Sequence, residues 1–207
     1  MSSSDYFDLK YLSKCFETSM EADKDIKLEP FLLGFQELNK FCDLMGGILF
    51  NAVSTEISSK SNILQEYLQK DAETFSSLQK MIAYERRENQ LNNGVCGCRT
   101  LLRLLRGLDF VRTFFEKVSQ LNYEDSTSSV GTEAYNQTLA QHHGFFVRQA
   151  ASIGLWTLPS KKELLRKLFG DRTDEAMEAL PVALKSCNCT YLKLHELFKS
   201  NNLLELP

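Results

Sequence analysis

The feature that most constrains this chain is helical periodicity, which runs almost without interruption from one end to the other. Apolar side chains recur every three or four residues, and no stretch of useful length shows the period-two alternation of a half-buried strand. Only 4 prolines and 10 glycines occur in 207 residues, so few positions force a helix to end. We therefore predict an all-α fold of about eight helices, over residues 5–20, 30–46, 47–69, 73–90, 97–121, 132–157, 160–169 and 173–200.

Several of the predicted helices are apolar over more than one face, as expected for helices that are sandwiched between layers. The length and the hydrophobic content of 43% suit one domain, residues 1–207, with a sizeable core. The 24 basic and 27 acidic residues give a net charge of −3, which argues against a nucleic-acid binder that works by bulk positive charge.

The N-terminal residues and the cysteines indicate the compartment. The chain does not begin with a basic segment followed by an apolar one, and no window approaches about 18 uninterrupted apolar residues. We therefore expect a cytoplasmic protein whose six cysteines stay reduced. The pairs Cys96/Cys98 and Cys187/Cys189 lack the spacing and the neighbouring histidine typical of structural zinc, so we expect free thiols and no metal.

Two charged side chains fall on the wrong face of a predicted helix. On a helix over 47–69, Glu56 and Lys60 lie in the middle of the apolar stripe, opposite a face of serine, asparagine and threonine. Ionisable groups within an apolar face are costly unless they have partners. The pair therefore indicates either a ligand site or a buried ion pair that ties two layers together.

Three arginines gather on one side of the predicted helix over 97–121. Arg99, Arg103 and Arg106 lie with Phe110 opposite the leucine-rich face, and no acidic residue lies between them. Guanidinium groups offer forked sets of donors that suit phosphate. The cluster indicates an anion site, although a solvated basic face has the same pattern.

A histidine completes the set of polar candidates. The predicted helix over 132–157 places His143 on one face with Leu139, Phe146 and Ala150. Such a histidine is more often a satisfied core residue than a ligand-binding one. Together the three predicted helices offer a carboxylate, an ammonium, guanidiniums and an imidazole, which suit a phosphate and an adjoining amide but include no obvious nucleophile.

Several stretches resemble the glycolipid transfer protein superfamily, and in particular its ceramide-1-phosphate transfer branch. The likeness covers about residues 5–207. It rests on Lys60 in SSK, GCRTLLRLLRGL (97–108), HHGFFVRQA (142–150), TLP (157–159) and the terminal LLELP. The resemblance implies a two-layer helical sandwich that encloses an apolar lipid pocket. The neutral-glycolipid branch carries tryptophan where this chain has Arg103, so phosphate is the expected head group.

The resemblance also implies roles for individual residues. Lys60, Arg99 and Arg103 would bind the phosphate, while Glu56 and His143 would bind the ceramide amide from its two sides. Glu56 stands where the family normally has aspartate, one methylene shorter. Two further sets are expected from the sequence: pocket-lining Val53, Phe110, Phe146 and Ala150, and membrane-contacting Phe145, Arg148, Lys161 and Lys162. A solvated basic helix start accounts equally well for the two lysines.

The implied activity is transfer of ceramide-1-phosphate, or a related phosphosphingolipid, between membranes without catalysis or a cofactor. We expect a monomer that binds no nucleic acid, stays cytoplasmic and contacts anionic membrane surfaces transiently. The alternatives are a lipid sensor or adaptor with the same fold, a carrier of neutral glycosphingolipids, and a lipid hydrolase that uses His143 and Glu56.

Overall fold

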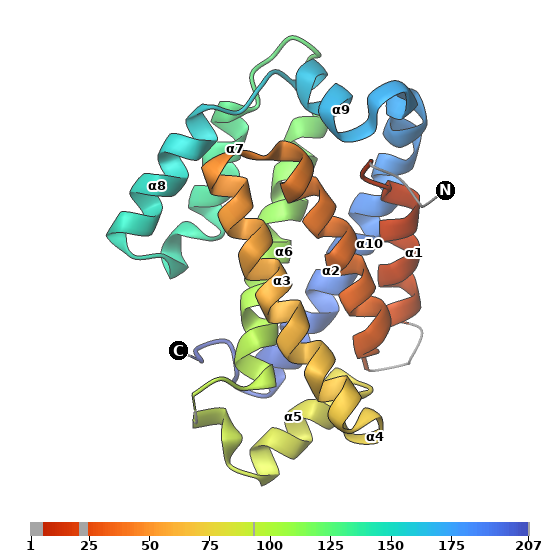
Figure 1. Cartoon of the computed structure of the whole chain (residues 1–207), viewed down its shortest axis with the longest axis vertical. Coiled ribbons are helices and arrows are strands. Elements are labelled where there is room, and N and C mark those ends of the chain that lie inside the picture. Colours follow the sequence, from red (N-terminus) through yellow and green to blue (C-terminus); the bar gives the residue numbers. More distant parts are fainter. Residues whose placement is uncertain (1–5, 21–24, 93, 207) are drawn as a thin grey trace.

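The computed structural model describes residues 6–20, 25–92 and 94–206, most of which lie in helices (Figure 1). The helices are α1 (Leu9–Ser19), α2 (Leu28–Met45), α3 (Gly47–Lys70), α4 (Ala72–Phe75), α5 (Leu78–Arg87), α6 (Gly97–Ser119), α7 (Ser128–Gln137), α8 (Phe145–Trp156), α9 (Lys161–Phe169) and α10 (Thr173–Ser200). Short 3₁₀ turns are η1 (Gln90–Asn92), η2 (Ala140–His142) and η3 (Gly170–Arg172). The described ranges hold isolated β-bridges, such as Lys27 with Ser77, but no strand, so the all-α prediction is confirmed.

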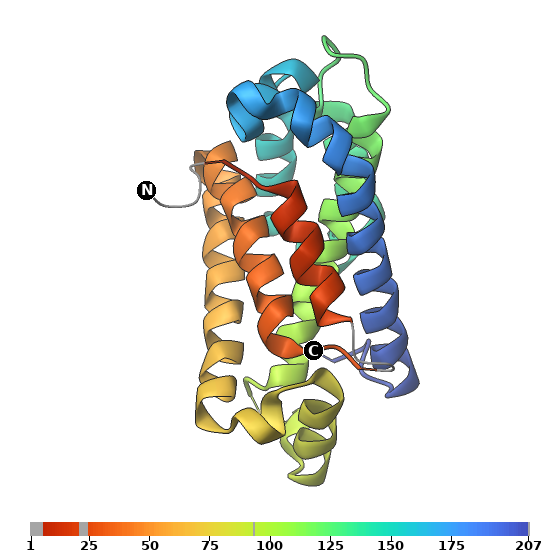
Figure 2. The same cartoon turned by 90° about the vertical axis from the view of Figure 1, so that its right-hand side faces the viewer.

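The long helices form two layers. Helices α1, α2 and α3 lie side by side in one layer, and α6 contacts α7 and α10 in the other. Contacts of α1 with α10 and of α3 with α6 join the layers. Figure 2 shows α2 and α3 on one side of the molecule and α6 and α10 on the other. The predicted helical sandwich is therefore confirmed.

Phenylalanine rings fill the space where the layers meet. Phe7, Phe41 and Phe115 come from the segment before α1, from α2 and from α6, and all three are buried. The ring centroids of Phe41 and Phe115 lie 5.1 Å apart, and those of Phe7 and Phe115 lie 5.9 Å apart. Burial of each ring stabilises the fold by about 1.5–3 kcal/mol, so this cluster does much to hold the layers together.

Most helix boundaries follow the sequence pattern, and the predicted helix over 132–157 is the main error. The chain leaves the helix at Thr138, with φ −121° and ψ −78°, where the threonine hydroxyl donates to the Ala134 carbonyl at 2.7 Å. It passes through η2, becomes extended at His143 and re-enters a helix only after Gly144. The predicted helix over 73–90 is likewise divided into α4 and α5, where the Ser77 side chain caps the start of α5.

The structure bears on three further expectations. All six cysteines are unpaired, as predicted. Within residues 6–20, 25–92 and 94–206, no group of three or more His, Cys, Asp or Glu side chains lies close enough together to hold a metal ion. None of the helices in these ranges is long and apolar enough to cross a membrane.

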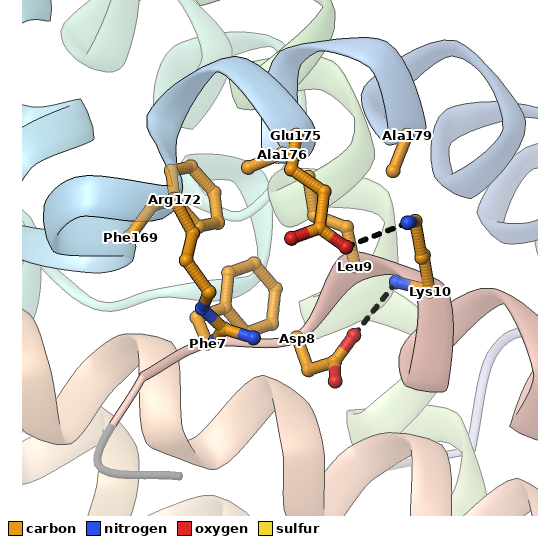
Figure 3. Close-up of a pocket in the computed structure, with 9 residues that line it drawn as sticks. All are labelled: Phe7, Asp8, Leu9, Lys10, Phe169, Arg172, Glu175, Ala176 and Ala179. Carbon is orange, nitrogen blue, oxygen red and sulfur yellow. Dashed lines mark hydrogen bonds and ion pairs between the residues drawn. The ribbon is translucent and has the colours of Figure 1, made fainter.

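A small cavity lies between the start of α1 and the start of α10 (Figure 3). Its volume is about 20 Å³, which is space for about one water molecule rather than a lipid chain. An ion pair between Lys10 and Glu175, with 2.6 Å between Nζ and Oε1, borders it. The residues that line it are Phe7, Asp8, Leu9, Lys10, Phe169, Arg172, Glu175, Ala176 and Ala179.

Candidate functional site

The charged residues that the sequence singled out meet where α3 crosses α6. Oε1 of Glu56 lies 3.4 Å from Nζ of Lys60 on the same helix and 3.4 Å from Nη1 of Arg103 on α6. The Lys60 side chain is only 17% exposed, whereas those of Glu56 and Arg103 are each 52% exposed. Solvent-exposed pairs of this kind contribute about 0–1 kcal/mol, so the cluster contributes little as a clamp between layers. It is open to an incoming group.

Arg99 lies one turn before Arg103 on the same side of α6. One arm of its guanidinium donates to the Gly94 carbonyl, and Nη2 donates to the Leu91 carbonyl at 3.4 Å. Its Nε is buried and has no hydrogen-bond partner in the described residues. The loop before α6 thus holds Arg99 beside the cluster while leaving part of its donor capacity unused.

Arg106 has a different task from its two neighbours. It is half-buried, and Nη2 donates to the Leu204 carbonyl at 3.1 Å. Burial lowers the pKa of Arg106 from its ordinary value, Glu205 acts against this shift, and Arg103 adds to it. Arg106 therefore holds the C-terminal segment against α6, next to the charged cluster.

Glu85 anchors the N-terminal end of α6. Its carboxylate is fully buried and accepts hydrogen bonds from the Gly97 amide at 2.5 Å and the Cys98 amide at 2.9 Å. A Cβ atom at Gly97 would lie 2.4 Å from Sδ of Met81 and 3.0 Å from Oε1 of Glu85, so only glycine permits this approach of α5 to α6. Two free amides at a helix N-terminus need an acceptor, and Glu85 supplies it.

The sequence reasoning did not identify Glu85. The available signal was its helical phase, since it falls on the face of α5 that buries Met81 and Ile82. Because Glu85 fixes the first turn of α6, it also fixes the backbone from which Arg99 and Arg103 extend.

His143 approaches the same cluster from an extended backbone rather than from a helix face. Its Nδ1 lies 2.9 Å from the hydroxyl of Tyr135, and the two ring centroids lie 5.7 Å apart. Burial and Arg106 lower the pKa of His143, while Glu56 raises it less. His143 is therefore neutral at pH 7 and lies within the electrostatic reach of Glu56. The prediction that it shares a helical face with Leu139 and Phe146 is wrong, because the chain breaks on both sides of η2.

The structure separates the four pocket-lining candidates. Val53 and Phe110 are half-buried and pack against the core, and Phe110 stacks on Phe114 with 6.0 Å between centroids. Phe146 is 85% exposed and Ala150 is also exposed, so neither lines the interior in this structure. The reason is the separate start of α8, which buries Ala151 and Leu155 instead.

The four membrane-contact candidates also differ in exposure. Phe145 and Arg148 are exposed on the first turn of α8. Lys161 is only 5% exposed, and its Nζ donates to the carbonyls of Ser119 at 3.1 Å and Leu121 at 2.7 Å. Its prediction as a membrane contact is wrong, because these donations satisfy the C-terminal end of α6. Lys162 is exposed, with its Nζ 3.0 Å from Oε1 of Glu124.

Two large apolar residues of α8 are exposed although the sequence pattern did not single them out. Ile153 is 69% exposed and Trp156 is 80% exposed. At 100° per residue they fall within the same arc of the helix as Phe145 and Phe146. These four residues form an apolar stripe on α8, and a helical projection that began at residue 145 would have found it.

Comparison with known proteins places this site in context. A model of the glycolipid transfer protein family matches residues 26–170. The ceramide-1-phosphate transfer protein of Xenopus tropicalis is 32% identical over 214 residues, which cover 100% of this chain and 99% of that protein. The mouse protein of the same name is 30% identical, with 97% of each chain covered.

Solved structures agree with these relatives. The crystal structure of mouse ceramide-1-phosphate transfer protein in its apo form superposes with a TM-score of 0.89, at 31% identity, over 97% of this chain and 100% of that one. The human protein in complex with 12:0 ceramide-1-phosphate superposes with a TM-score of 0.87, at 28% identity and the same coverage. This chain therefore belongs to the glycolipid transfer protein family.

Proposed function

We propose that this protein carries ceramide-1-phosphate between membranes. The observation that carries the proposal is the open cluster at the crossing of α3 and α6, where Lys60 and Arg103 share one carboxylate and Arg99 lies one turn away. Relatives that cover 97–100% of the chain bear the name ceramide-1-phosphate transfer protein, which supports the same ligand.

Charge balance favours a phosphate head group. Glu56 pairs with Lys60 and Arg103, and Arg99 lies one turn before Arg103, so these three positive side chains exceed the charge of Glu56 by two. A phosphomonoester carries about −1.5 to −2 at pH 7, so it matches this surplus. Each charge-assisted hydrogen bond contributes about 1.5–3 kcal/mol, whereas a neutral sugar or a bare hydroxyl forms weaker bonds.

The amide would bind beside the phosphate. A phosphate that binds Lys60 and Arg103 competes with Glu56 for both cations, and its arrival frees the Glu56 carboxylate to accept the amide N–H. His143, on the segment between η2 and α8, would bind the amide from the other side. Glu56 has one methylene more than the aspartate of the family, and its reach to Arg103 across the layers makes use of that length.

Transfer needs no covalent step. Passing an acyl chain through water costs about 0.8 kcal/mol per methylene, so a chain of roughly sixteen carbons meets a barrier on the order of 12 kcal/mol. An apolar interior between the layers replaces contacts with other lipids and removes most of that barrier. In this proposal Val53 and Phe110, which already pack against the core, lie near the head-group end of that interior.

The apolar stripe on α8 is the surface we assign to the membrane. Phe145, Phe146, Ile153 and Trp156 are all more than half exposed, and Arg148 lies beside them. Aromatic side chains suit the boundary between head groups and acyl chains, and a neighbouring arginine favours anionic lipids. A contact this small allows the loaded protein to leave the membrane again.

The test is transfer between vesicles of four fluorescent lipids: ceramide-1-phosphate, ceramide, phosphatidic acid and galactosylceramide. We expect ceramide-1-phosphate to move fastest, because it alone offers both the phosphomonoester and the amide. Equal or faster transfer of galactosylceramide would overturn the phosphate assignment. Tight binding of ceramide-1-phosphate without transfer would favour a lipid sensor instead.

A further inference from the structure

We propose that Tyr135 is a positioning residue that holds neutral His143 as the tautomer with its proton on Nε2, so that His143 donates to the carbonyl of the lipid amide while Glu56 accepts from its N–H. The proposal rests on the proposed function, because it concerns the amide end of the same site. It adds a residue outside the phosphate and amide sets.

Tyr135 is well placed to fix an imidazole. It lies near the end of α7, where its side chain is only 6% exposed, and its hydroxyl lies 2.9 Å from Nδ1 of His143. Thr138 ends α7 three residues later, which brings the chain around so that His143 faces back onto Tyr135. The ring of Tyr135 is thus fixed by the core, and its hydroxyl fixes the histidine.

The direction of this hydrogen bond follows from the needs of the two groups. Burial raises the pKa of Tyr135, so its hydroxyl keeps its proton at neutral pH. Among residues 6–20, 25–92 and 94–206, Nδ1 of His143 is the partner that the structure gives this hydroxyl. A buried hydroxyl that only accepted would leave its own proton without a partner, at a cost of about 1–3 kcal/mol. Tyr135 therefore donates, and Nδ1 accepts with its lone pair.

The surroundings of His143 keep the ring neutral. Arg106 on α6 adds to the effect of burial, and Glu56 on α3 opposes it more weakly. Burial also lowers the pKa of the neighbouring His142, where Arg106 and His143 add to the effect and Glu205 and Asp109 oppose it. A neutral ring whose Nδ1 accepts a hydrogen bond must carry its proton on Nε2.

With this tautomer, the amide end of the site offers one donor, Nε2–H of His143, and one acceptor, the carboxylate of Glu56. A secondary amide offers the complementary pair, a carbonyl and an N–H. The ester linkage of a glycerophospholipid offers the carbonyl only and leaves the Glu56 carboxylate without a donor. The choice of an amide-linked lipid over an ester-linked one therefore falls to Glu56, while Tyr135, acting through His143, strengthens the contact with the carbonyl that both linkages offer.

The test combines spectroscopy with a double-mutant cycle. Nitrogen-15 NMR of the histidine rings at pH 8 reports which ring nitrogen carries the proton, and loss of the signals in His143→Ala assigns them. We expect wild type to show protonated Nε2 with an accepting Nδ1, and Tyr135→Phe to show a mixture of tautomers. A protonated Nδ1 in wild type would overturn the proposal.

The transfer arm separates positioning from general stability. Tyr135→Phe should slow ceramide-1-phosphate transfer about 3- to 10-fold, the range of a single neutral hydrogen bond, and should also slow phosphatidic acid transfer, because its ester offers the same carbonyl to His143. In a His143→Ala background the same substitution should have no further effect, because Tyr135 acts through His143. An equal loss in both backgrounds would show a merely structural role and overturn the proposal.

The matched control is Tyr191→Phe, which removes a half-buried hydroxyl that donates to Asp109 at 3.3 Å. It should preserve the His143 tautomer. If wild type fails to transfer ceramide-1-phosphate at all, the proposed function fails, while the NMR measurement still decides the role of Tyr135.

Discussion

Replacing Arg103 with glutamine separates head-group binding from folding more cleanly than any other change at this site. Arg103 is half exposed, and the structure gives its guanidinium one ion-pair partner, Glu56, at 3.4 Å. An exposed pair of this geometry contributes about 0.2–1 kcal/mol to stability. Arg103→Gln should therefore lower the free energy of unfolding by no more than about 1 kcal/mol.

The effect on ligand binding should be far larger. A guanidinium that donates to a phosphate contributes about 1.5–3 kcal/mol, which corresponds to a factor of roughly 10 to 150 in affinity. Transfer of ceramide-1-phosphate at limiting protein should fall by a comparable factor. Transfer of ceramide, which has no phosphate, should change by less than about twofold.

Two assays decide this prediction. Initial rates of transfer between vesicles measure the ligand effect, and urea unfolding followed by circular dichroism measures stability. Arg87→Gln is the control, because Arg87 is exposed and its Nε lies 2.8 Å from Oε1 of its chain neighbour Glu88. If Arg103→Gln transfers ceramide-1-phosphate within about twofold of wild type, the reasoning that places phosphate at this cluster is refuted.

Three further predictions follow from contacts around the site. Glu85→Ala leaves the buried amides of Gly97 and Cys98 without acceptors, so it should lower the free energy of unfolding by about 2–5 kcal/mol. Urea unfolding measures this loss, and a loss below about 0.5 kcal/mol would contradict the anchoring role of Glu85. Burial holds the pKa of His143 below its ordinary value, so the contribution of neutral His143 to folding stability is complete above about pH 6.5 and is lost as the pH falls. The urea midpoint should therefore drop less between pH 7.5 and 5 in His143→Gln than in wild type. An equal drop in the two proteins would exclude His143 as the cause. Phe146→Ser should weaken sedimentation with anionic vesicles and preserve the free energy of unfolding, whereas Lys161→Met should preserve sedimentation and lower the free energy of unfolding. If Lys161→Met instead weakens sedimentation and Phe146→Ser does not, the membrane contact lies on α9.

The sequence predicts the long helices well because their cause is local. Apolar residues at helical spacing define α2, α3, α6 and α10 to within two residues at each end. The break between α7 and α8 has another origin. Thr138 and His143 leave the helix without any proline, and the hydrogen bonds that stabilise the departure depend on Tyr135 and the core, which periodicity does not reveal.

The charged site could be predicted in part. Helical phase placed Glu56 next to Lys60, but their contact with Arg103 depends on how α3 crosses α6, which helical phase alone does not reveal. The sequence pattern does not reveal which charged side chains are buried. Lys161 looks like an exposed basic residue at a helix start, yet its stem is buried and its ammonium donates to carbonyls at the end of α6.

Competition among lipids tests the central claim most directly. Native mass spectrometry of the full chain, after incubation with equimolar ceramide-1-phosphate, ceramide, phosphatidic acid and galactosylceramide, reads occupancy without a label. We predict a one-to-one complex that holds mainly ceramide-1-phosphate, with the preference lost in Arg103→Gln. Equal occupancy by the four lipids, or a preference for galactosylceramide, would contradict it.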